Sequence, residues 1–147
     1  MRVFLRRNAA MFSIGALGYC TIELIWRQHT HWSMGLAGGV CLIGLREVER
    51  RMKNRKLSTQ CLAGSALITS VELLIGLWVN RAMGWAIWDY SNMPLNVMGQ
   101  ICPLYSGLWF LLCMPIMRTF RAVSYTHLDV YKRQMTASPL RRVSSEA

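Results

Sequence analysis

Two carboxylates, Glu23 and Glu72, lie inside long apolar segments of the chain. An ionised side chain at membrane depth is costly unless it is paired, so such residues mark ion, proton or substrate sites by default. The two acids could share a proton, pair with Arg27 or Arg81, or accept hydrogen bonds from amide side chains. For Glu23 a position near the outer membrane surface, where water solvates the carboxylate, is the alternative. We predict that both acids line an intramembrane polar site.

Two amides, Asn96 and Gln100, form a second candidate pair four residues apart. If this stretch is helical, both side chains lie on one face. Amides are costly against lipid, so that face should look toward another helix. The amides either join Glu23 and Glu72 in lining a substrate site or only hold helices together. The predicted substrate-lining set is therefore Glu23, Glu72, Asn96 and Gln100.

The residues just before these amides suit a membrane–water boundary that leads into a helix. Tryptophan and tyrosine favour that boundary. Serine or asparagine can cap a helix, and proline suits the first helical turn. The aspartate of this stretch is expected to cap or pin the loop. We define the interface motif as Trp88, Asp89, Tyr90, Ser91 and Pro94.

Residue patterns for enzymatic or metal chemistry are weak in this sequence. His29 and His31 form a His-x-His pair, but two ligands without a third nearby favour hydrogen bonding at the interface over metal binding. The five cysteines form no C-x-x-C pair, so they are expected to be small apolar fillers. We find neither a nucleophile–base pair nor a phosphate-binding loop. The sequence predicts no catalytic residues, no metal, no cofactor and no enzymatic activity. A third hypothesis, an intramembrane enzyme that acts on a lipid-borne substrate, would need a nucleophile that we do not find in the sequence.

Composition points to a small membrane protein of one domain. The chain has 147 residues, 53% of them hydrophobic, and a formal net charge of +10. In a soluble protein such a positive charge would suggest nucleic-acid binding. Here the basic residues cluster between apolar blocks, as in cytoplasmic loops of membrane proteins. The expected partner is the lipid bilayer rather than nucleic acid.

The apolar blocks predict an all-α polytopic membrane protein with four transmembrane helices. The predicted spans are residues 9–26, 32–48, 57–79 and 95–117. Most basic residues fall at the N-terminus, in the 46–56 loop and after the fourth span, which places both termini in the cytoplasm. Thr-Ile-Glu-Leu at 21–24 echoes Ser-Val-Glu-Leu at 70–73. This echo indicates two helix-pair repeats related by an axis along the membrane normal.

Residues 122–134 break every earlier pattern. They resemble the translation of two head-to-head transposon adaptor ends used in sequencing libraries. One set of codons for this segment contains a long inverted repeat that reads the same on both strands. We therefore interpret 122–134 as a sequencing-adaptor artefact and 135–147 as a tail of doubtful origin, and confine the domain to residues 1–121.

Three motifs carry a resemblance to a known family. They are Ser-Val-Glu-Leu-Leu-Ile-Gly at 70–76, Trp-Asp-Tyr-Ser-x-x-Pro-x-Asn at 88–96, and Gly-Gln-Ile-Cys at 99–102 followed by Trp109. Over most of residues 9–117 the chain resembles the "Putative ABC-transporter type IV" family of small bacterial membrane proteins. The resemblance implies a permease in the bacterial inner membrane. Four helices without a nucleotide-binding domain are too few for a complete pump, so transport would require self-association and a separate ATPase.

Two functions follow as hypotheses. The first is a permease-like, multi-pass subunit of the cell membrane that binds substrate at its polar site and works with a separate ATPase. The alternative is a non-transporting membrane scaffold or sensor, in which the same polar groups only hold the helices together.

Overall fold

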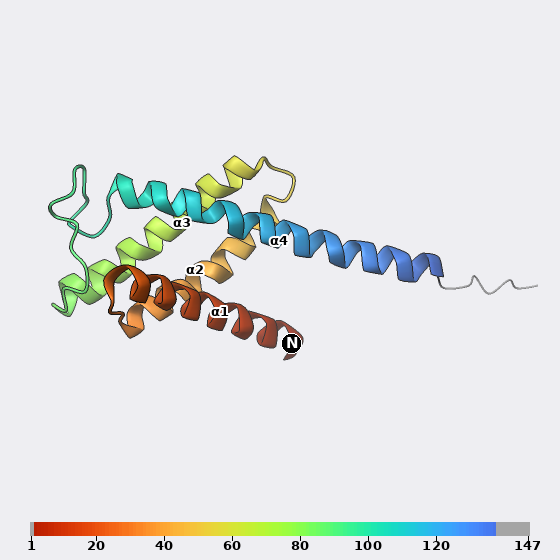
Figure 1. The fold of residues 1–147 in the computed structure, drawn as a ribbon, viewed down its shortest axis with the longest axis horizontal. Coiled ribbons are helices and arrows are strands. Elements are labelled where there is room, and N and C mark those ends of the chain that lie inside the picture. Colours follow the sequence, from red (N-terminus) through yellow and green to blue (C-terminus); the bar gives the residue numbers. More distant parts are fainter. Residues whose placement is uncertain (1, 138–147) are drawn as a thin grey trace, which may run out of the picture.

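The computed structural model describes the backbone of residues 2–137 and the side chains of residues 5–123. This part of the chain is all-helical, with one isolated β-bridge between Val97 and Ile101 and no strand. The elements are α1 (Arg2–Arg27), α2 (Trp32–Arg51), α3 (Leu57–Gly76), the π-helix η1 (Leu77–Ala82) and α4 (Pro103–Ala137) (Figure 1). The predicted all-α class with four helices is confirmed.

The connections between the first three helices are short. Gln28 has a φ of 63°, a left-handed conformation that ends α1. The ring of His31 then caps α2 by accepting a hydrogen bond from the backbone N–H of Ser33 at 3.3 Å. At the far end of α2, the Gln60 side chain donates to the carbonyl of Met52 at 2.7 Å. These caps fold the first three helices into a tight antiparallel series.

The predicted start of the fourth helix at residue 95 is wrong. Residues 83–102 form a loop, and α4 begins at Pro103. Proline suits this position, because the backbone N–H that it lacks would have no acceptor within the first turn of a helix. Leu95 and Met98 have φ values of 56° and 55°, and Gly99 has a φ of 71°. A right-handed helix requires negative φ at each of these positions, so it cannot run through them.

In the described part of the chain, two helical segments are by length and composition able to cross a membrane, Leu5–Arg27 and Leu57–Ala82. Crossings by α2 and α4, the two helix-pair repeats and the cytoplasmic termini stay predictions. Helix α4 continues through residues 122–134. The adaptor interpretation concerns the origin of these residues and stays a prediction, while residues 138–147 of the predicted tail lie outside the described part.

Helix α2 is central in the bundle, where it packs against α1 and α3 and more lightly against α4. Helices α3 and α4 also pack together, but the backbones of α1 and α4 scarcely approach each other (Figure 1). One apolar core lies among α2, α3 and α4. Its buried members include the free thiols of Cys41, Cys61 and Cys113, in keeping with their predicted role as small fillers. The fold therefore leaves one open side, between α1 and α4.

Candidate functional site

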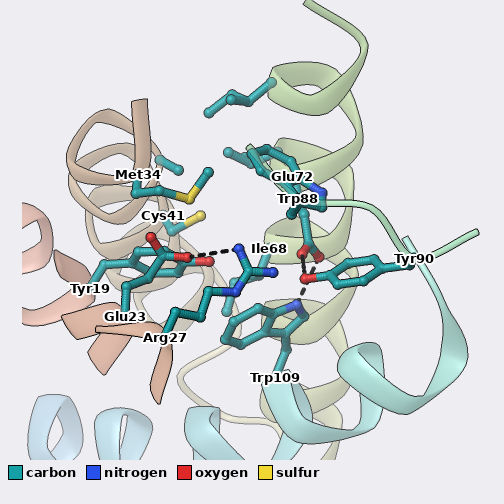
Figure 2. Close-up of a pocket in the computed structure, with 13 residues that line it drawn as sticks. Tyr19, Glu23, Arg27, Met34, Cys41, Ile68, Glu72, Trp88, Tyr90 and Trp109 are labelled. Carbon is teal, nitrogen blue, oxygen red and sulfur yellow. Dashed lines mark hydrogen bonds and ion pairs between the residues drawn. The ribbon is translucent and has the colours of Figure 1, made fainter. Parts of the chain in front are cut away.

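Glu72 of α3 occupies the centre of a buried polar cluster. The side chain is 8% exposed, and each of its carboxyl oxygens accepts one hydrogen bond. The Tyr90 hydroxyl donates to Oε1 at 3.1 Å, and the Trp109 indole N–H donates to Oε2 at 2.9 Å (Figure 2). The three side chains come from α3, the 83–102 loop and α4. Glu72 therefore ties together the second half of the chain.

Glu23 and Arg27, one turn apart on α1, approach the same cluster from the opposite side. Glu23 is 9% exposed and lines the groove between α1 and α4, and the alternative of a carboxylate near the outer membrane surface stays open. Its Oε1 lies 3.7 Å from Nη1 of Arg27, and its Oε2 accepts a hydrogen bond from Thr30 at 3.3 Å. Arg27 also donates to the carbonyl of Ile87 at 3.3 Å. Of the two predicted basic partners, Arg27 therefore pairs with Glu23.

The two sides face one another across a small cavity of about 20 Å³. In Figure 2 the Arg27 guanidinium reaches between Glu23 and the Tyr90–Glu72 pair. Met34 and Cys41 of α2 line the same cavity, together with Tyr19 of α1. The two carboxylates predicted to line an intramembrane site are thus brought together.

A wider groove opens from this cavity on the side between α1 and α4. Its first part has a volume of about 320 Å³ and is lined by both Glu23 and Arg27. A second part of about 310 Å³ continues along the same two helices with apolar walls. Both parts share Tyr19 and Trp109 with the small cavity. The polar cluster is therefore reached from the open side of the bundle.

The predicted role of Asn96 and Gln100 is corrected by the structure. They share no helical face, because the backbone around them is a loop, and neither lines the cavity or the groove. The Asn96 amide donates to the carbonyl of Met93 at 2.9 Å and accepts from the N–H of Gly99 at 3.0 Å. Gln100 is 4% exposed and donates to the carbonyl of Met98 at 3.1 Å. Both amides shape the loop.

The residues of the predicted interface motif lie in the 83–102 loop and do not lead from a membrane–water boundary into a helix. Trp88 and Tyr90 are buried rather than at a wet boundary, and Trp88 donates from its indole to the carbonyl of Gln100 at 3.0 Å. Ser91 and Pro94 belong to the loop and do not begin a helix. Burial of Trp88 and Tyr90 places the Tyr90 hydroxyl within hydrogen-bond distance of Glu72.

Asp89 has the loop-pinning role that its place in the motif predicts. The Ser91 hydroxyl and backbone N–H both donate to its carboxylate. These hydrogen bonds hold the pKa of Asp89 below its usual range. Gly99 packs against the same turn, since a Cβ there would lie 2.7 Å from Asp89 Oδ1.

Asn80 of η1 is a structural residue that the sequence reasoning missed. Its Nδ2 donates to the carbonyl of Trp88 at 2.9 Å and to Oε1 of Gln100 at 2.8 Å. Its Oδ1 accepts from the N–H of Ile87 at 2.8 Å. An asparagine that directly follows an apolar span is the one sequence feature that could have indicated this role.

Replacing Asn80 with leucine should loosen the 83–102 loop. Three polar groups would lose their partner at once, and each unmet buried group costs about 1–3 kcal/mol. We expect the unfolding free energy to fall by about 2 kcal/mol or more, together with faster proteolysis within residues 83–102. Asn96→Leu is the matched control, with a smaller loss because Asn96 bonds only within its own turn. Equal losses would show that Asn80 does not anchor the loop.

Of the two loop histidines, His31 belongs to an aromatic cluster outside the polar site, and His29 contacts the backbone. His31 lies 5.1 Å from the ring of Trp85 and 5.4 Å from that of Trp32, and its Nδ1 lies 2.9 Å from the Ser33 hydroxyl. His29 Nδ1 lies 2.8 Å from the carbonyl of Arg27. Among the described residues, no three His, Cys, Asp or Glu side chains come close enough to hold a metal.

Comparison with known proteins identifies the family. The family model described as "Putative ABC-transporter type IV" matches residues 9–139. The chain belongs to this family. No curated protein and no solved structure matches the chain. Together with two helices able to cross a membrane, the family supports a membrane protein related to ABC transporters.

Proposed function

We propose that this chain is a permease-like membrane subunit whose substrate contacts the polar cluster between α1 and α4. The supporting observation is that two buried carboxylates, Glu23 and Glu72, lie together with the half-buried Arg27 where a groove opens. The backbones of α1 and α4 scarcely approach each other, so the groove can admit a ligand without breaking a close backbone contact between these helices. Charged groups at membrane depth are characteristic of substrate and ion pathways.

In this proposal the chain works in the bacterial inner membrane as a multi-pass, non-enzymatic component. Energy comes from a separate ATPase, and at least two copies are needed to enclose a pathway. The basic segment 46–56, which comprises the end of α2 and the short connection to α3, lies on the predicted cytoplasmic side, the side on which a nucleotide-binding subunit works. The family description supports this partnership.

The subunit role is tested by purifying the tagged chain from membranes of its native host. We expect vanadate-sensitive ATP hydrolysis to co-purify with it and to be lost when the tag is placed on an unrelated membrane protein. A preparation that is pure, folded and without ATPase activity would favour the alternative, a non-transporting scaffold or sensor.

A further inference from the structure

Aromatic rings surround the charged end of the groove. Tyr19 and Trp109 lie 6.0 Å apart between their ring centroids, from α1 and α4. Tyr90 and Tyr105 stack at 4.4 Å. Trp26 completes the wall on the α1 side. The faces of such rings carry negative electrostatic potential and attract organic cations.

The charges at this end are unequal. Glu23 and Glu72 supply two carboxylates, whereas Arg27 is the one basic side chain, among those that the structure describes, that lines the small cavity or the groove. With both acids ionised, one negative charge is left without a basic partner. A buried carboxylate is costly to ionise, and a bound cation would offset that cost.

The rest of the groove is apolar. Its second part, of about 310 Å³, is lined by aliphatic and aromatic side chains and glycines and by no ionisable acid or base other than Tyr19 and Cys41. Ile14 and Ile116 mark its far end on α1 and α4. Apolar surface buried there would contribute about 25 cal/mol per Å². A ligand that fills both parts therefore needs a positive head and an apolar body.

We propose that the α1–α4 groove binds a lipophilic organic cation, with its charge beside Glu23, next to the small cavity that holds Glu72, and its apolar body along the groove. This names a substrate class for the proposed transport function and rests on it for its biological meaning. Binding itself can be measured on the purified chain without any ATPase. A membrane lipid chain that enters the groove regardless of charge is the competing occupant.

Tetraphenylphosphonium is a suitable probe, because tetraphenylborate has a similar shape and the opposite charge. Binding of radiolabelled tetraphenylphosphonium is measured on the purified chain in a nonionic detergent. We expect saturable binding that excess tetraphenylborate does not displace. Tetraphenylborate that competes equally well would show an apolar groove indifferent to charge and would overturn the proposal.

Three variants test the location of the probe. Glu72→Gln should weaken binding at least roughly tenfold, because it removes a buried negative charge from the small cavity that adjoins the groove. Arg27→Gln should strengthen binding, because it removes the competing positive charge. Glu47→Gln is the control, since Glu47 lies near the other end of α2 and pairs with Arg50 and Arg51. Opposite effects at positions 72 and 27 cannot arise from loss of folding, and unchanged binding in both variants would overturn the proposal.

The two proposals fail in different ways. Phosphonium binding without a co-purifying ATPase would support the cation site and contradict the transporter role. A co-purifying ATPase with a chain that does not bind phosphonium would overturn the cation inference alone.

Discussion

Gly38→Val should cause the largest loss of stability among single substitutions in the bundle. A Cβ at Gly38 would collide with the carbonyl oxygen of Gly15 and with Cβ of Tyr19. The reverse is also true, since a Cβ at Gly15 would meet the Gly38 carbonyl oxygen. Close backbone approach through small residues is how membrane helices gain packing energy. Because the first obstacle is backbone, relief requires α1 to move away from α2.

We expect Gly38→Val to lower the unfolding free energy by about 3 kcal/mol or to prevent folding. The measurement is the unfolding temperature in detergent. Gly18→Val is a matched control on α1, because a Cβ at Gly18 meets nothing within 4 Å and the change in helix propensity is the same. If both variants melt alike, the close α1–α2 contact does not exist.

Glu72→Gln should have the largest effect on function with a small effect on folding. Glutamine keeps one oxygen for the Trp109 indole or the Tyr90 hydroxyl, so the lost hydrogen bond costs about 1 kcal/mol. The charge, in contrast, is removed completely from a site that is 8% exposed. We expect ATP-driven transport to fall at least roughly tenfold. Glu47→Gln, on an exposed helix face, should leave transport unchanged.

The sequence predicted the helices and the two acids better than the loop that completes the site. Glu23 and Glu72 could be recognised because a charged residue in a long apolar segment is rare and costly. The first and third helices could be placed from apolar length alone. A charged residue in an apolar segment and the length of an apolar segment are local features of the sequence, so both can be recognised without knowing how the helices pack.

The start of the fourth helix could not be predicted in the same way. Aromatic residues, a serine and a proline before Asn96 matched a helix start, but positive φ at Leu95 and Met98 is not visible in residue type. Tyr90 reaches Glu72 only because the loop folds back over α3, and Asn80 holds that loop from η1. Such long-range hydrogen bonds leave no periodic pattern, so the roles of Asn80, Asn96 and Gln100 emerged only from the structure.

The central claim is that the buried polar cluster contacts a substrate and does more than join helices. It is tested most directly by measuring ATP-driven transport and unfolding temperature for Glu72→Gln in the same proteoliposomes. We expect transport to be lost while the unfolding temperature stays within a few degrees of that of the unsubstituted protein. Retained transport together with a clear drop in unfolding temperature would contradict it and would identify Glu72 as a structural residue.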